Sequence, residues 1–207
     1  MAAGRAFSSS IVRQQKRKVE MKMTKSMLVA LAAVLMAGSV RAEVVEQTAN
    51  GFSLQEHVTI AAAPDKVYAE LIQPAHWWSS SHTFSGDAKN MTFDARAGGC
   101  WCETLKDGGS VLHMSVINVV PGKLLRMRGA LGPFQSTGMD GAMNIVLTAK
   151  GKSTEVALVY NLGGYVWGGY QALPASADGV LGLQIYRLKQ LIETGSADTP
   201  RPAGEKP

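Results

Sequence analysis

Residues 58–72 read Val-Thr-Ile-Ala-Ala-Ala-Pro-Asp-Lys-Val-Tyr-Ala-Glu-Leu-Ile, and within this stretch the spacing of apolar residues changes from that of a strand to that of a helix. Apolar residues alternate unevenly along residues 52–62, which predicts a first strand. Pro64 and Asp65 then favour a helix start, because proline needs no backbone donor there and a carboxylate suits the positive end of a helix. Pro74 ends this helix, and we expect a second short helix or an irregular turn directly after it.

The region from Met91 to Tyr165 consists of apolar runs separated by turn residues. Five or six strands fit into its roughly 75 residues, at spacings typical of antiparallel hairpins rather than of crossover connections. The turns are marked by glycines, often next to aspartate, proline or lysine: Ala97-Gly98-Gly99, Asp107-Gly108, Pro121-Gly122, Gly141 and Lys150-Gly151.

A glycine- and aromatic-rich segment, residues 163–170, separates the last strand from a long closing helix predicted over Pro174–Thr194. This helix has a broad apolar face, and Gly195 supplies its stop. Residues 196–207 contain three prolines and no large apolar residue, so we expect a disordered tail there. The order of elements predicts one α+β domain over residues 43–195.

Residues 1–42 account for the net positive charge of the chain. Their eight Lys or Arg against one acid give +7, whereas the remaining residues carry −2. This segregation removes the argument for a nucleic-acid partner. Two lysines precede an uncharged apolar run of about 11 residues, too short to be a permanent membrane anchor. Small residues then stand at the −3 and −1 positions of a site after Ala42. We expect residues 1–42 to be an N-terminal extension plus a secretory signal peptide, cleaved after Ala42, and the protein to be periplasmic or secreted.

The composition places the chain among ordinary globular proteins. Its 207 residues, 46% apolar and 18% charged, suit a single hydrophobic core and exclude a disordered chain, a collagen and a disulfide-dense miniprotein. No nucleophile elbow, Walker loop, His-Glu-x-x-His or dinucleotide fingerprint occurs in the sequence. The sequence therefore lacks the motifs that the common hydrolase, nucleotide-dependent and zincin mechanisms require, and we expect no cofactor.

The order of elements, together with four short segments, resembles the SRPBCC superfamily of START and Bet v-like proteins. It is most similar to the polyketide cyclase and Hsp90-ATPase-activator-like branch. The resemblance covers about residues 52–194. It implies a helix-grip fold, in which a curved antiparallel sheet wraps a long C-terminal helix, two short helices follow the first strand, and an apolar cavity is enclosed. Because the superfamily includes carriers, receptors and cyclases, the resemblance implies a cavity rather than a reaction. The four segments are Val58–Tyr68, Pro74–Trp78, Gly98–Glu103 and Val120–Leu124.

The turns also predict the register of the central strands. A two-residue hairpin at Asp107-Gly108 places Cys102 opposite His113 and Cys100 opposite Ser115. A turn at Pro121-Gly122 that pairs Val120 with Lys123 adds two arginines to the same face. We therefore expect one face of the sheet, turned away from the closing helix, to carry Cys100, Cys102, His113, Arg126 and Arg128.

Three interpretations of the two thiols are open. A zinc or copper site on Cys100, Cys102 and His113 needs a fourth donor. A disulfide between residues two apart needs a bulge, because their Cα atoms lie about 6.5–7 Å apart in a regular strand. The default expectation is two reduced thiols without metal, packed as small side chains.

The opposite face of these strands is the more apolar, and we expect the closing helix to pack on it unless a bulge exchanges the faces. Glu103 is the exception on this face. It is our candidate catalytic acid or base, or it orients a ligand hydroxyl, or it lies in water at the rim of the sheet. The glycines around Tyr165 and Trp167 permit a mobile lid. The apolar residues expected on this face are Trp101, Leu105, Leu112, Met114, Val116, Leu125 and Met127. The residues expected to bind a ligand are Trp77, Trp101, Glu103, Met114, Met127, Tyr165 and Trp167.

The leading functional hypothesis is an exported binding or carrier protein that encloses a small apolar or aromatic molecule between the sheet and the C-terminal helix. The first alternative is a cofactor-free enzyme of cyclase or dehydratase type, with Glu103 or a histidine as general base. The second alternative is a thiol or metal stress protein that uses Cys100, Cys102 and His113. The sequence predicts neither the identity of the ligand nor the oligomeric state.

Overall fold

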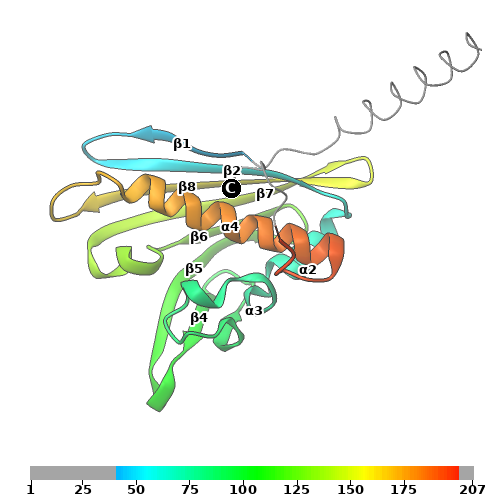
Figure 1. Ribbon diagram of the computed structural model, residues 1–207, viewed down its shortest axis with the longest axis horizontal. Helices are drawn as coiled ribbons and strands as arrows, with labels where there is room; N and C mark the ends of the chain where they lie inside the picture. The colour runs from blue at the N-terminus through cyan, green and yellow to red at the C-terminus, as the bar shows by residue number, and fades with distance from the viewer. Residues whose placement is uncertain (1–40, 201–207) are drawn as a thin grey trace, which may run out of the picture. The chain divides into compact units, whose positions relative to one another are not determined.

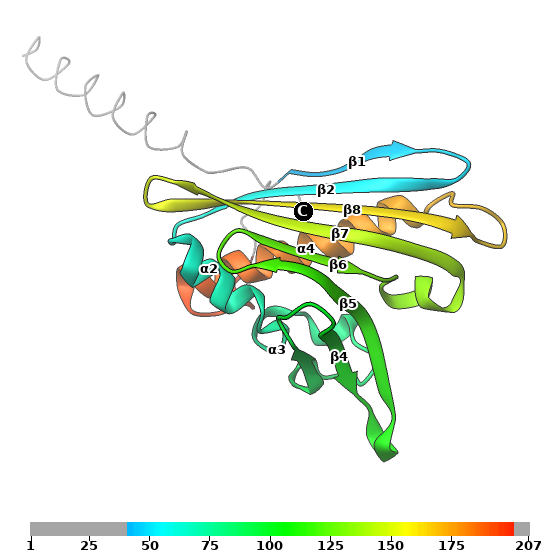
Figure 2. The same cartoon turned by 180° about the vertical axis from the view of Figure 1, so that it is seen from behind.

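An eight-stranded antiparallel sheet, with strand order β1-β2-β8-β7-β6-β5-β4-β3, forms the framework of the computed structural model, which describes residues 41–200. The long helix α4 lies against one face of this curved sheet, and the opposite view shows the strands in front of it (Figures 1 and 2). This is the α+β helix-grip fold that the sequence predicts. The strands are β1 (Arg41–Gln47), β2 (Gly51–Ile60), β3 (Met91–Phe93), β4 (Cys100–Thr104), β5 (Ser110–Val120), β6 (Leu124–Arg128), β7 (Gly138–Lys150) and β8 (Ser153–Tyr165).

The helices lie close to where the sequence places them. The first two are α2 (Pro64–Leu71) and α3 (Pro74–Trp77), each with proline in its first turn, and α4 runs from Leu173 to Thr194. Short 3₁₀ turns η2 to η5 are found at Ser80–His82, Ala88–Asn90, Lys106–Gly108 and Gly132–Ser136. Among residues 41–200, no helix is long and apolar enough to cross a membrane.

The core lies between α4 and the facing side of the sheet. Leu181, Ile185, Leu188 and Ile192 recur every three or four positions along α4 and are all buried, which is the spacing of a single helix face. They form one cluster with the inward residues of β2, β7 and β8. Gly195 ends the helix in the left-handed conformation, with φ 83°, and its N–H donates to the carbonyl oxygen of Leu191.

Two findings differ from the sequence predictions at the ends of the domain. Strand β1 was not predicted, and it spans the expected cleavage site after Ala42, because Ala42 pairs with Glu56 of β2. The expected disordered tail is ordered over its first residues: Ala197 is buried, and Asp198 forms an ion pair with Arg187 of α4. Residues 201–207 and the expected signal peptide up to residue 40 lie outside the described residues.

Two β-bulges shape the central strands. In the β4–β5 hairpin, Thr104 pairs with Ser110 and Cys102 with Leu112, but Trp101 pairs with Met114. His113 is therefore an extra residue in β5. A second bulge, between Val116 and Asn118, shifts the pairing of β5 with β6. Each bulge changes which side chains face the core.

Candidate functional site

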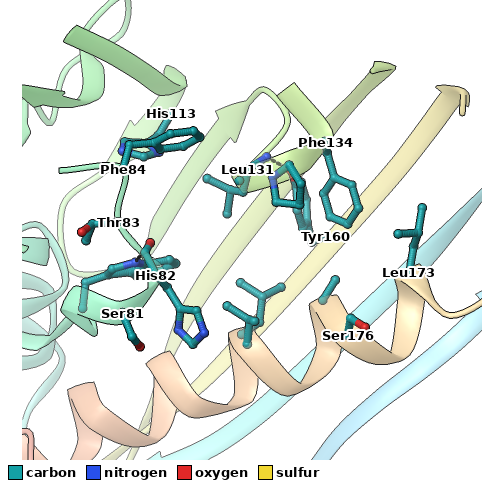
Figure 3. Close-up of a pocket in the computed structure, with 16 residues that line it drawn as sticks. Ser81, His82, Thr83, Phe84, His113, Leu131, Phe134, Tyr160, Leu173 and Ser176 are labelled. Atoms are coloured by element: carbon teal, nitrogen blue, oxygen red, sulfur yellow. Dashed lines mark hydrogen bonds between the residues drawn. The ribbon is translucent and has the colours of Figure 1, made fainter. Parts of the chain in front are cut away.

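A cavity of about 460 Å³ opens between α4 and the concave side of the sheet. Figure 3 shows His113 and Phe84 at one end of it and Phe134 and Leu173 at the other. Its volume is within the usual range for small-molecule sites. Its walls are mostly carbon and come from the segment after α3, from β5, the region around η5, β8 and the first half of α4. The lining residues are Trp78, Ser81, His82, Thr83, Phe84, His113, Leu131, Gly132, Pro133, Phe134, Tyr160, Leu173, Ser176, Ala177, Val180 and Leu181.

One wall of the cavity is an irregular segment, residues 79–85, that is held by two buried polar side chains. Gln184 of α4, which is 1% exposed, accepts a hydrogen bond from the Ser79 N–H with Oε1, and its Nε2 lies 2.9 Å from Nδ1 of His82. Glu103 of β4 accepts from the backbone N–H groups of Phe84 and Ser85. These contacts fix a segment that has no regular ladder of its own.

Glu103 is buried and fully engaged in hydrogen bonds. The residue is 1% exposed, and its Oε2 lies 2.9 Å from Nε2 of His113 in addition to the two backbone donors. Burial by itself raises the pKa of Glu103, but the hydrogen bonds from Ser85, Phe84 and His113 outweigh burial and leave the pKa below its ordinary value. Glu103 is therefore an ionised hydrogen-bond acceptor at neutral pH, and not the proton donor or rim residue considered from the sequence.

His113 is the partner of Glu103 and a wall residue of the cavity. It is 4% exposed, and burial lowers its pKa below 6.5, an effect that the adjacent Glu103 carboxylate only partly offsets. The imidazole is therefore neutral at pH 7. Since a carboxylate oxygen can only accept, the single proton of this neutral ring lies on Nε2. His113 also borders a second groove, which includes Leu112, Ile117 and Arg128.

The position of His113 corrects the sequence prediction. A regular hairpin places it beside the cysteines on the outer face, but the bulge turns it inward next to Met114, and Leu112 becomes 55% exposed instead of buried. The end of β6 approaches this bulge closely. A Cβ on Gly129, which has φ 145°, would lie 2.9 Å from the carbonyl oxygen of His113.

The two thiols form a disulfide, contrary to the expected reduced state. Cys100 and Cys102 are bonded, with their Cα atoms 5.5 Å apart. This separation is shorter than two residues of a regular strand span, about 6.5–7 Å, and the bulge begins between Trp101 and Cys102. The structure does not assemble the metal site considered from the sequence, because both sulfurs are bonded to each other and His113 lies on the inner face. Among residues 41–200, no cluster of His, Cys, Asp and Glu is suited to a metal ion.

Tyr160 is the other buried polar group in the wall. Its hydroxyl donates to the carbonyl oxygen of Gly129 and accepts from the N–H of Leu131. Burial raises its pKa, so that the phenol stays protonated at neutral pH. The hydroxyl thus tethers the chain that leads from β6 into η5, and Tyr160 presents mainly its ring to the cavity.

None of the residues expected to bind a ligand lines this cavity directly. Trp77, Trp101, Met114 and Met127 are buried in the core, and Glu103 contacts the wall residues His113 and Phe84 without lining the cavity itself. Tyr165 is 67% and Trp167 is 89% exposed, in the segment between β8 and α4. The observed wall uses Phe84, Leu131, Phe134 and Tyr160, which carry no recognisable motif; the aromatic rings at 78 and 84 were the only local signal.

Comparison with known proteins supports the fold. No family model and no curated protein matches the chain. Among solved structures, CalU16 from Micromonospora echinospora is 14% identical, with a TM-score of 0.51 over 81% of this chain and 88% of that chain. DynU16, from the dynemicin biosynthetic locus, is 20% identical over 70% and 48% of the two chains, with a TM-score of 0.48. The Aha1 dimer structure from Colwellia psychrerythraea is 18% identical over 69% of this chain and 97% of that chain, with a TM-score of 0.44. At such identities the similarity to CalU16 supports the helix-grip fold and no particular activity.

Proposed function

We propose that this protein is an exported binding or carrier protein for a small apolar or aromatic molecule. The observation that carries this proposal is the carbon-lined cavity of about 460 Å³ between α4 and the sheet. A ligand there gains affinity chiefly by burying apolar surface, at about 25 cal/mol per Å². The few polar groups in the wall then determine its orientation.

Two features support export. Residues 1–42 have the charge and the apolar run of a secretory signal peptide. The Cys100–Cys102 disulfide is of the kind that persists in oxidising compartments and is rare in the cytosol. Sequencing of the mature N-terminus tests this part of the proposal: we expect it at Glu43, and exported protein that retains residues 1–42 would contradict it.

The carrier function is tested by filling the cavity from α4. Ala177 lines the cavity, whereas Ala175 is exposed and does not line it. We expect the neutral naphthalene dye prodan to bind the wild type saturably and to change tryptophan emission, because Trp78 forms part of the wall. Ala177→Phe should reduce dye affinity at least tenfold, and Ala175→Phe should leave it unchanged. Equal affinity in all three proteins, or no saturable binding, would argue against a ligand chamber.

The His113–Glu103 pair favours a second candidate function, a cofactor-free acid–base enzyme. A neutral imidazole whose Nε2–H is held by a carboxylate presents Nδ1 as a potential base. The base is then His113 rather than Glu103. In D2O, exchange of the methyl protons of 2-acetonaphthone, followed by NMR, tests this candidate. Catalysis that the His113→Phe variant lacks would support it, and exchange no faster than with free imidazole would exclude it.

A further inference from the structure

The charge of the cavity wall restricts the ligand more than its apolar character does. None of the sixteen wall residues is Lys, Arg, Asp or Glu. A buried carboxylate, that of Glu103, lies directly behind His113 with 2.9 Å between Oε2 and Nε2. A carboxylate or phosphate group of a ligand would therefore meet no cation in the wall and would face an ionised acid one side chain away.

The protonation of His113 determines what the wall offers instead. Because Oε2 of Glu103 accepts, Nε2 of the neutral ring carries the proton and Nδ1 does not. Among residues 41–200, the only hydrogen bond of this side chain is the one to Glu103. Nδ1 is thus a free acceptor on a side chain that lines the cavity.

The other polar groups of the wall are already committed or lie at the surface. The hydroxyl groups of Tyr160 and Thr83 donate to the carbonyl oxygens of Gly129 and Ser80. Ser81, His82 and Ser176 are exposed. Among the buried and half-buried side chains of the wall, Nδ1 of His113 is therefore the polar atom that makes no hydrogen bond, and each side-chain donor already has an acceptor.

We propose that the ligand is a neutral molecule with an apolar or aromatic body and one hydroxyl group, a phenol or an alcohol, that donates a hydrogen bond to Nδ1 of His113. This inference rests on the proposed binding function and specifies its ligand class. It excludes fatty acids and aromatic acids, whose anions find no counter-charge, and it favours the hydroxyl compound over its methyl ether, which has no proton to donate.

Three naphthalenes of similar size test the ligand class by titration calorimetry: 2-naphthol, 2-methoxynaphthalene and 2-naphthoate. We expect 2-naphthol to bind roughly tenfold more tightly than the methyl ether, the effect of one net hydrogen bond. The carboxylate should bind at least as weakly as the ether. Equal affinity for naphthol and ether, or tight binding of naphthoate, would overturn the inference while the carrier function stands. If none of the three and no prodan binds, the carrier function itself fails.

Removing the acceptor on His113 tests the mechanism. His113→Phe keeps an aromatic ring in the wall but has no nitrogen that can accept from the ligand hydroxyl. The preference for naphthol over the ether should then fall to about one. His76→Phe, at an exposed position beside Glu70, is the matched control and should keep the wild-type preference. An unchanged preference in His113→Phe would overturn the inference.

Two measurements make the result independent of how well that variant folds. Nitrogen-15 NMR of the wild type should show the proton of His113 on Nε2 and should show the Nδ1 signal shift when 2-naphthol is added; a proton on Nδ1 would overturn the inference directly. Ala177→Phe should abolish naphthol binding. Binding that survives this substitution would place the ligand in the groove beside Leu112 and Ile117, and would also overturn it.

Discussion

Nε2 of His113 lies 2.9 Å from Oε2 of Glu103, although a regular hairpin would place these two side chains on opposite faces of the sheet. In the pairing of β4 with β5, the residue opposite Glu103 is Val111 and not His113. The contact exists because His113 is the extra residue of the β5 bulge and is turned to the inner side. The buried polar pair therefore depends on the bulge, and the bulge coincides with the short span between Cys100 and Cys102.

The first prediction concerns this disulfide. The Cys100→Ser, Cys102→Ser double variant should lose about 1–2 kcal/mol in free energy of unfolding, because the closed loop is very short. It should also weaken the pairing of His113 with Glu103, since the strand is then free to lengthen toward its regular register. Denaturant unfolding measures the first effect and the NMR signals of the His113 ring the second. A ring environment identical to that of the wild type would show that the bulge forms without the disulfide.

The second prediction concerns pH. Both His113 and Glu103 have pKa values that folding lowers. The unfolded chain therefore binds more protons than the folded one, and stability must fall as the pH falls. The loss should begin as the pH drops below 6.5, the ordinary value for histidine, and should continue below 4.5 as Glu103 is protonated. Urea midpoints between pH 8 and 4 measure it.

The variant His113→Phe tests whether His113 causes the loss of stability at the upper end of this pH range. His113→Phe should be less stable at pH 8 but should lose the dependence between pH 6.5 and 5. His76, which is exposed beside Glu70, provides the control: His76→Phe should keep the wild-type profile. A His113→Phe profile parallel to that of the wild type would mean that another group is responsible.

The positions of the helices and strands could be predicted from the sequence more accurately than which side chains of each strand face the core. The apolar spacing and the stop at Gly195 were sufficient for α4, and Leu125 and Met127 of β6 are buried as expected. His113 and Leu112 lie on the opposite faces from those predicted, because one extra residue in a strand reverses the alternation of inward and outward side chains. No residue type in the sequence indicates where such a bulge occurs. The cavity was predicted as a feature of the fold. Its walls were not, since they come from segments around residues 78–84, 131–134 and 173–181 that are brought together only by the tertiary fold.

The third prediction separates two tryptophans that the sequence assigned to the same site. Trp101 is buried at the edge of Trp78, with ring centroids 4.7 Å apart, whereas Trp167 is 89% exposed. Trp101→Ala should lower the free energy of unfolding by about 3–5 kcal/mol, and Trp167→Ala should change it by less than about 0.5 kcal/mol. Trp167→Ala should also leave prodan affinity unchanged, because Trp167 does not line the cavity. A loss of affinity in that variant would restore the lid suggested by its glycine neighbours.

The last prediction concerns Gln184, the buried residue that ties α4 to the segment at 79–85. Gln184→Leu keeps the apolar contacts of the helix but leaves the Ser79 N–H without its acceptor and His82 without its neighbour. An unsatisfied buried group costs about 1–3 kcal/mol, and we expect a loss of that size in the free energy of unfolding. Because this segment forms one wall of the cavity, prodan affinity should fall as well, and backbone amides of residues 79–84 should exchange with solvent faster. Gln190→Leu is the matched control on the same helix: Gln190 is also buried, and among residues 41–200 its side chain makes no hydrogen bond. If both variants lose dye affinity equally, the effect comes from general loosening of α4; if only Gln184→Leu does, the hydrogen bonds to Ser79 and His82 hold the cavity wall in place.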